Sequence, residues 1–257
     1  MSVNEEEYLS KNKQKKADRY RNEVEKKKSR RKQEQEKQRE RFKQYRQSGG
    51  LSKEDLKIVQ RERLTRAQEG GVRVCVDFQF EADMNEKELN HFANQAKRVY
   101  GSNKSAENPF NLYFINLSKS SKTYQLCCEK NDGFESYLLH SEEEGIEDLF
   151  DLDTVVYLSP DSETTLETID PDTVYVIGGL VDDSVKKNTS TQYSQSVGVK
   201  TARLPITDYM KRSESGSFKQ ILTINQVFDV LLDFHSTGDW SSALGKNIPP
   251  KTGFTLK

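Results

Sequence analysis

The sequence predicts an α/β protein in which a mainly parallel sheet is flanked by helices and preceded by a basic helical arm. Two observations lead to this fold class. From Val72 onward, short apolar runs alternate with segments of helical pattern, as in proteins with a parallel sheet. The charge is also divided, because residues 1–69 hold 22 Lys and Arg against 13 Asp and Glu, whereas the other 188 residues hold 18 against 28. We therefore expect an arm over 1–69 and one folded domain over 70–257.

The arm is rich in good helix formers. Residues 11–46 contain 17 basic and 6 acidic side chains and no Gly or Pro, which favours a helix. They lack an apolar heptad repeat, so a coiled coil is not expected. A second polar helix is expected over about 52–68. The excess of positive charge, with Tyr20, Phe42 and Tyr45 interspersed, predicts contact with RNA phosphates. A solvated charged helix or a disordered tail is the alternative.

Five apolar runs predict the strands of the sheet. Their apolar residues follow one another with little alternation, which is typical of strands that are buried on both faces. The runs lie at 72–78, 110–117, 154–159, 173–179 and 200–205.

Two capping boxes predict where helices begin. Asn85 and Glu88 form the first, ahead of a helix expected to run to about Tyr100. Thr223 and Gln226 form the second, ahead of an amphipathic segment.

Three further helices are expected from weaker signals. Pro160 is typical of the first turn of a helix, and Asp161 beside it is then interpreted as a cap rather than a catalytic residue. The other two helices are expected over about 185–196 and around Trp240.

Several kinds of site lack their motifs. The sequence contains no Gly-x-Gly-x-x-Gly fingerprint, no phosphate-binding P-loop and no Gly-x-Ser-x-Gly elbow. Its histidines stand singly and its cysteines form neither a disulfide framework nor a Cys-x-x-Cys pair, so no metal is expected. These residues are His91, His140, His235, Cys75, Cys127 and Cys128. No apolar run approaches the ~20 residues of a membrane span, and the acidic first residues predict a nuclear or cytosolic protein.

Ligands of parallel α/β domains bind beyond the carboxyl ends of the strands. Paired glycines, Gly178 and Gly179, follow one predicted strand and let the backbone approach a ligand closely, although they are also typical of a tight turn. The loops expected at this edge are 158–162, 178–183 and the pair 203–205 and 220–223.

Seven motifs follow one another in a set order from residue 76 to residue 251. They are VDFQFEADMNEKEL (76–89), YLSPDSE (157–163), VYVIGGLVDDSVKKN (174–188), GVKTARLPI (198–206), ILTINQVF (221–228), GDW (238–240) and IPPK (248–251). Over about 72–252 the sequence thus resembles the eukaryotic and archaeal tRNA position-nine N1-methyltransferases of the SPOUT superfamily. The resemblance implies a parallel sheet with a deep trefoil knot on the C-terminal side. It also implies S-adenosylmethionine as methyl donor, no metal, tRNA as partner and a monomeric enzyme.

The resemblance further implies which residues hold S-adenosylmethionine. Leu204 and 220–222 are expected to hold the adenosine through backbone contacts. Ser190 departs from the family, in which Cys is common there, and the segment 209–219 looks longer than usual, which leaves the register at Gln220 open by a residue or two. Carried over by motif position, the full set is Leu158, Ser159, Gly178, Gly179, Asp182, Asp183, Ser184, Val185, Lys186, Ser190, Leu204, Gln220, Ile221 and Leu222.

Two carboxylates are the candidate catalytic residues. Guanine N1 carries a proton at neutral pH, so a base beside it would free its lone pair; the resemblance points to Asp182 for this role. Asp77, at the end of the first strand, either orients the base or Asp182, or is structural. Methylation of guanine at position 9 of tRNA is the leading interpretation. Adenine, or both purines, is the second, and a non-catalytic tRNA-binding subunit of a processing complex is the third.

Overall fold

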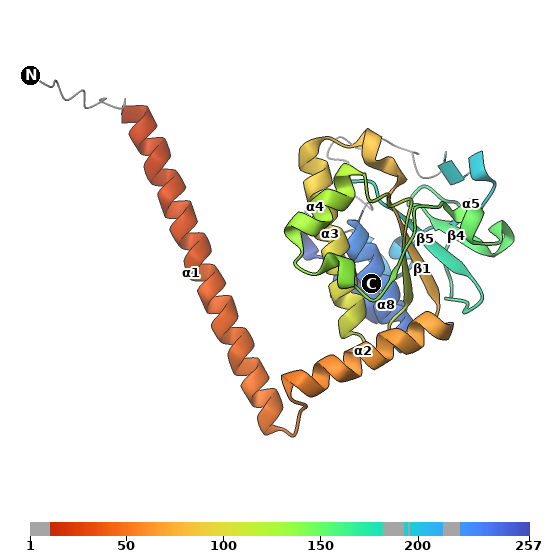
Figure 1. The fold of residues 1–257 in the computed structure, drawn as a ribbon, viewed down its shortest axis with the longest axis horizontal. Coiled ribbons are helices and arrows are strands. Elements are labelled where there is room, and N and C mark those ends of the chain that lie inside the picture. Colours follow the sequence, from red (N-terminus) through yellow and green to blue (C-terminus); the bar gives the residue numbers. More distant parts are fainter. Residues whose placement is uncertain (1–10, 182–192, 195, 213–221) are drawn as a thin grey trace, which may run out of the picture. The chain divides into compact units, whose positions relative to one another are not determined.

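The computed structural model describes residues 11–181, 193–194, 196–212 and 222–257. The chain divides into two compact units, Met1–Lys57 and Ile58–Lys257. The first unit contains helix α1 (Lys11–Gln47), and the second contains the sheet and the helices around it (Figure 1).

Helix α1 confirms the helical interpretation of the arm. No described side chain of this helix is buried, and Tyr20 is 69% exposed. Arg30 and Glu34, one turn apart, approach to 3.6 Å, a surface pair of small energetic value. Helix formation therefore rests on residue propensity over the long run without Gly or Pro.

Helix α2 (Lys53–Gly70) confirms the second predicted helix and packs mainly with the sheet unit. Leu64 joins the main hydrophobic core, and Ala67 is buried beside it. The Asn111 amide group donates a hydrogen bond to the carbonyl of Gln68 at 3.2 Å. The structural units thus meet between Lys57 and Ile58, ahead of the boundary that the charge distribution predicts after residue 69. The two boundaries differ because the charge distribution reflects composition alone, whereas Leu64 and Ala67 are buried and therefore belong to the packed unit.

All neighbouring strands of the six-stranded sheet are parallel, in the order β3-β2-β1-β5-β4-β6. The five predicted strands are all present, which confirms the α/β class. The sixth, β3, has two residues, too few to leave a periodic signal. The strands are β1 (Arg73–Asp77), β2 (Asn111–Ile115), β3 (His140–Ser141), β4 (Val155–Leu158), β5 (Val174–Gly178) and β6 (Lys200–Ala202).

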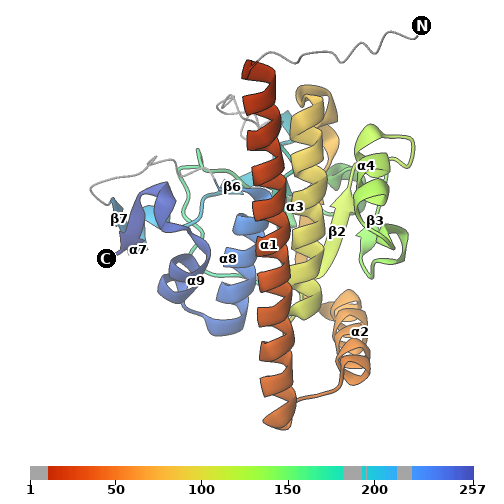
Figure 2. The same cartoon turned by 90° about the vertical axis from the view of Figure 1, so that its left-hand side faces the viewer.

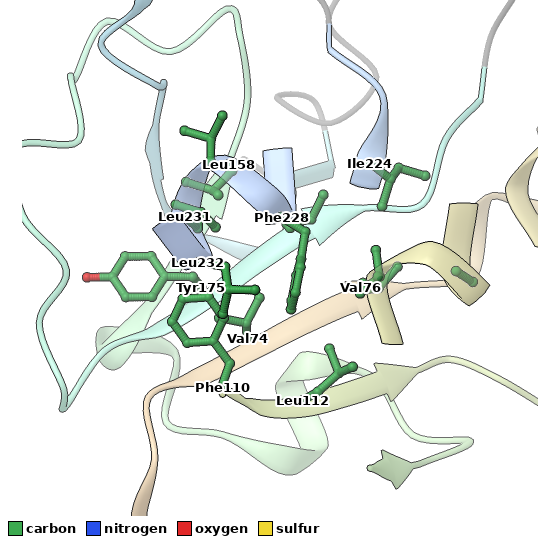
Figure 3. Close-up of a cluster of buried hydrophobic side chains, with 14 of the residues drawn as sticks. Val74, Val76, Phe110, Leu112, Leu158, Tyr175, Ile224, Phe228, Leu231 and Leu232 are labelled. Carbon is green, nitrogen blue, oxygen red and sulfur yellow. The ribbon is translucent and has the colours of Figure 1, made fainter. Parts of the chain in front are cut away.

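Both faces of the sheet are buried, which explains the nearly continuous apolar runs of its strands. On one face, Val74 and Val76 of β1 belong to the main core together with Phe228 and Leu231 of helix α8 (Ile224–Thr237), as Figure 3 shows. On the other face, a second cluster contains Cys75, Tyr157 and Val176 from three neighbouring strands, with Ile146 of the short helix α5 (Ile146–Leu149).

Helices α3 (Glu86–Ser105) and α8 lie side by side over the main core (Figure 2). Both begin at the predicted capping residues: Asn85 caps α3 in a box with Glu88, and the Gln226 side chain accepts the Thr223 N–H at 3.0 Å. The other helices of the sheet unit are α4 (Lys122–Lys130), α7 (Ile206–Tyr209) and α9 (Trp240–Asn247), the last being the helix expected around Trp240. Most of the helix expected over 185–196 lies outside the described residues.

The prediction of a helix that begins at Pro160 is wrong. The chain makes a turn there, in which the Asp161 N–H donates to Ser159 Oγ at 3.3 Å. The backbone that follows pairs at once with the chain after β6, because the Arg203 N–H donates to the Thr164 carbonyl at 2.8 Å. This pairing leaves no length for a helical turn, so Asp161 is not a helix cap.

A second, two-stranded sheet was not predicted. Strand β7 (Met210–Arg212) pairs antiparallel with β8 (Phe254–Leu256), residues that are far apart in the sequence. Within the described ranges no helix is both long and apolar enough to cross a membrane. The trefoil knot stays a prediction.

Candidate functional site

Four strands of the parallel sheet end next to one another. The register aligns Asp77 of β1 with Gly178 of β5, and Leu158 of β4 with Ile177 of β5 on one side and Ala202 of β6 on the other. The carboxyl ends of β1, β5, β4 and β6 therefore form one edge. The predicted ligand-binding loops begin at this edge, as expected.

The structure describes six of the residues that the family resemblance assigns to S-adenosylmethionine. Leu158, Ser159 and Gly179 are buried, and Gly178, Leu204 and Leu222 are half-buried. Five of them lie at the strand ends of the carboxyl edge or in the loops that follow, and Leu222 lies just before α8. The remaining predicted residues lie outside the described ranges, and they are Asp182, Asp183, Ser184, Val185, Lys186, Ser190, Gln220 and Ile221.

Gly179 lies where two backbones approach most closely. Its N–H donates to the carbonyl of Asp77 at 2.8 Å, which extends the pairing of β1 with β5 by one residue. A Cβ atom at this position would stand 2.1 Å from that carbonyl oxygen and 2.5 Å from Cζ of Phe92. Only glycine fits, and the need arises from packing inside the sheet edge rather than from a positive φ angle.

The first and third loops are joined into one layer. Ser159 donates its N–H to the carbonyl of Ala202 at 2.9 Å, and Leu166 donates to the carbonyl of Arg203 at the same distance. The Arg203 guanidinium donates to the carbonyls of Ser162, at 2.7 Å, and Glu163. These contacts cross-link the loop after β4 to the loop after β6.

Gln95 anchors the approach to helix α8. This buried side chain of α3 accepts the N–H of Ile224 at 2.9 Å. Leu222 comes two residues earlier, so the bond fixes the start of α8 close to the predicted adenosine contact. Gln95 was not among the residues predicted from the sequence, although a polar residue on the apolar face of a helix indicates such a role.

Asp77 ends β1 as a fully buried carboxylate. Its Oδ1 accepts hydrogen bonds from the Gln79 N–H at 3.1 Å and from the Asn116 amide group at 2.9 Å. Its Oδ2 accepts from the Gln79 side chain at 2.5 Å and from the Tyr157 hydroxyl at 3.0 Å. Burial raises the pKa of Asp77, and the hydrogen bonds, that from Asn116 first, oppose this rise. Asp77 is thus held inside the sheet edge rather than turned toward an open space.

The described residues contain no group of three or more His, Cys, Asp or Glu that could hold a metal ion. The three histidines are separate: His140 stacks on Tyr113, His235 lies against Phe110, and His91 is exposed. At this edge the described residues offer backbone groups, apolar side chains and a few polar side chains.

Comparison with known proteins identifies the relatives of this chain. A protein-family model described as tRNA (guanine(9)-N(1))-methyltransferase TRM10/TRM10A matches residues 7–253. The mouse tRNA methyltransferase 10 homolog B is 46% identical over 208 residues, which cover 80% of this chain and 65% of that protein. The tRNA (guanine(9)-N1)-methyltransferase of Schizosaccharomyces pombe is 33% identical over 206 residues, which cover 77% and 64%. The chain thus spans slightly less than two thirds of the length of these curated relatives.

The fold is also that of known structures. The crystal structure of full-length spTrm10 in complex with SAH superposes with a TM-score of 0.61 at 29% identity, covering 69% of this chain and 95% of the other. The family match and the likeness to this solved structure agree with each other. The chain belongs to the TRM10/TRM10A family of tRNA (guanine(9)-N(1))-methyltransferases.

Proposed function

We propose that this protein transfers a methyl group from S-adenosylmethionine to N1 of guanine at position 9 of tRNA. The observation that carries the proposal is the convergence of the family's loops at one edge of the sheet, in a chain that the family model covers from residue 7 to residue 253. The complex of spTrm10 with SAH supports S-adenosylmethionine as the donor. Action as a monomer, which the resemblance implies, belongs to the same proposal.

The described loop residues suit an adenosine group. Leu158, Leu204 and Leu222 come from different loops and all pack at the main core, the last two half-exposed at its surface. Small-molecule sites combine such apolar surfaces with a few backbone hydrogen-bonding groups. Gly178, half-buried at the end of β5, leaves its backbone open to close approach. The predicted residues outside the described ranges would complete this site.

The reaction asks two things of the chain. When bound, S-adenosylmethionine supplies an electrophilic sulfonium methyl group. The chain must hold N1 of the base in line with this methyl group and must take the proton that guanine N1 carries. Asp182 is our candidate for the general base that accepts this proton. An ordinary Asp has a pKa near ~3.9 and is a weak base, so this role requires partial desolvation that raises its pKa.

Replacing Asp182 with Asn tests the base role. We expect kcat on a tRNA with G at position 9 to fall about 10²–10⁴-fold, the usual contribution of general-base catalysis. Adenine N1 carries no proton, so any activity on a tRNA with A at position 9 falls less. Because Asp182 is also among the residues predicted to hold S-adenosylmethionine, calorimetry measures separately how much of the loss comes from weaker binding, and the fall in kcat is compared at saturating S-adenosylmethionine. Asp172→Asn, in the exposed turn before β5, is the matched control, and an unchanged kcat for Asp182→Asn on guanine contradicts the role.

Helix α1 is the proposed source of tRNA affinity. Its described side chains are solvent-accessible along the whole helix, and positive charge prevails among them. Phosphate contacts of this kind do not depend on sequence and weaken with salt. The target base lies within the folded tRNA, so exposing it costs free energy that contacts elsewhere on the tRNA must offset.

A further inference from the structure

Asp77 is bonded to four other segments of the chain, three through its carboxylate and one through its backbone carbonyl. Its donors come from the 3₁₀ turn η1 (Gln79–Asp83), from Asn116 beyond β2 and from Tyr157 in β4, while its own backbone carbonyl accepts the Gly179 N–H. An ionised carboxylate offers about four acceptor sites, and four donors occupy them. Asp77 therefore has no acceptor site left over for a nucleobase.

Asn116 is held in an unusual conformation for this contact. Its φ angle is 55°, which makes it the one non-glycine residue with positive φ that the backbone of the described ranges shows. Its N–H donates to the carbonyl of Glu144 at 3.0 Å, and its side chain reaches Asp77. The left-handed region is unfavourable for residues other than glycine, so the surrounding bonds must maintain it.

The same cluster holds the chain before Asp182. Gly179 is bonded to the carbonyl of Asp77, and the Val181 N–H points to Sδ of Met84 at 3.4 Å. Met84 is the residue that caps η1, the turn whose first residue, Gln79, gives two hydrogen bonds to Asp77. The residues just before Asp182 are thus tied to Asp77 by two routes.

It also holds the chain after residue 192. The ring of Tyr193 meets the ring of Tyr157 edge-on, with centroids 5.6 Å apart, and the ring of Phe80 in η1 at 6.0 Å. Burial first, and then the charge of Asp77, raise the pKa of Tyr193 to about 12. Both flanks of residues 182–192, the segment that contains the proposed base, therefore rest on the Asp77 cluster.

We propose that Asp77 is a positioning residue: with Gln79, Asn116 and Tyr157 it holds the two flanks of the segment 182–192, and it acts on methyl transfer without touching the reacting atoms. The inference rests on the proposed function of that segment in binding S-adenosylmethionine. It decides between the roles that the sequence leaves open for Asp77, in favour of support for the Asp182 segment and against contact with the base.

Removing one donor tests the proposal without altering the carboxylate. Tyr157→Phe keeps the ring contact with Tyr193 and deletes a hydrogen bond to a charged group. We expect it to weaken the affinity for S-adenosylmethionine, measured by calorimetry without tRNA, about tenfold, and to speed hydrogen exchange at Gly179 and Val181. Asp77→Asn should show the same two effects, and the double variant should be less impaired than the sum, because the two residues share one contact.

Tyr175→Phe is the matched control. Like Tyr157→Phe, this variant removes one buried tyrosine hydroxyl. The Tyr175 hydroxyl accepts the Asp170 N–H at 2.7 Å and lies outside the Asp77 cluster, so the affinity for S-adenosylmethionine should stay at the wild-type value. Wild-type affinity and wild-type exchange in Tyr157→Phe would overturn the proposal, as would an Asp77→Asn variant that loses only kcat. If Asp77→Asn does not fold, Tyr157→Phe decides alone. A wild-type protein that binds no S-adenosylmethionine would instead refute the proposed function, so the two failures are distinguishable.

Discussion

Single residues at the carboxyl edge of the sheet determine where the loops begin. Gly179 permits the backbone of β5 to pass within hydrogen-bonding distance of Asp77, and Phe92 closes the space above it. Arg203 joins two loops through carbonyls of the first. Each of these residues acts through the backbone of its neighbours. Substitutions here should change ligand affinity through displaced backbone more than through lost side-chain contacts.

Gly179→Ala gives the sharpest prediction at this scale. The added methyl group would overlap the Asp77 carbonyl, a backbone atom that cannot swing aside. We expect a loss of about 1–3 kcal/mol in the free energy of unfolding, typical of overpacking, and weaker binding of S-adenosylmethionine. Urea denaturation and calorimetry measure the two effects. In Gly101→Ala, by contrast, the new Cβ of the exposed α3 residue meets nothing within 4 Å, so stability should hold or rise by up to ~1 kcal/mol.

Helices α3 and α8 supply many side chains of the main core and pack against each other. Asn103, fully buried near the end of α3, bonds both the N–H and the carbonyl of Phe110 at the entry to β2, at 2.8 and 2.9 Å. Phe110 in turn contacts Phe228 and His235 of α8. The helices are thus joined to the amino ends of the strands, opposite the ligand edge.

His235 makes the stability of this helix layer depend on pH. The ring is half-buried beside Phe110, and burial lowers its pKa. Between its unfolded pKa near ~6.5 and the lower folded value, the unfolded chain binds a proton that the folded chain does not. The contribution of this ring to the free energy of unfolding is therefore highest above pH ~6.5 and declines as the pH falls below this value toward the folded pKa. Urea titrations from pH 7.5 to 5.5 should show a shallower decline for His235→Phe. If stability falls as steeply in His235→Phe as in the wild type, this prediction is wrong. It is also wrong if the control His91→Gln, at an exposed site, makes the decline equally shallow.

Local patterns in the sequence predicted most helices and strands of the sheet, but contacts between residues far apart in the sequence were not predicted. The capping boxes at Asn85 and Thr223 rest on residues three apart, so the sequence reveals them. Strand β7 pairs with β8 across more than forty residues, and the turn at Pro160 is imposed by pairing with the chain after β6. Asp77 was recognisable as a carboxylate at a strand end, but its donors lie on three separate segments. No local pattern contains such a network.

The whole molecule combines a basic arm with a ligand-binding domain. Unit Met1–Lys57 contains α1, and Leu64 and Ala67 of α2 are buried in the second unit. A deletion up to residue 69 would therefore remove part of the core. The informative deletion ends at Lys57, because it removes the arm and spares those side chains. The nuclear or cytosolic location expected from the sequence stays a prediction.

Deleting residues 1–57 should weaken tRNA binding and leave the affinity for S-adenosylmethionine unchanged. Fewer phosphate contacts should also flatten the dependence of log Kd on log salt concentration. Filter binding at several salt concentrations measures both. A milder variant that replaces Lys26, Lys27 and Lys28 with Gln keeps the helix formers and should lie between the two. Full tRNA affinity after the deletion would show that the arm is not the source.

Methyl transfer to matched tRNA transcripts would show whether the chain methylates N1 of guanine at position 9. Transcripts carrying G, A or C at position 9 are incubated with labelled S-adenosylmethionine and the full chain, and the label is mapped to the modified base. We expect label on the G transcript, at N1 of that guanine, and none on the C transcript. Label on A as well would extend the substrate to both purines. Tight tRNA binding with no label on any transcript would refute the proposed methyltransferase activity and would indicate a tRNA-binding subunit instead.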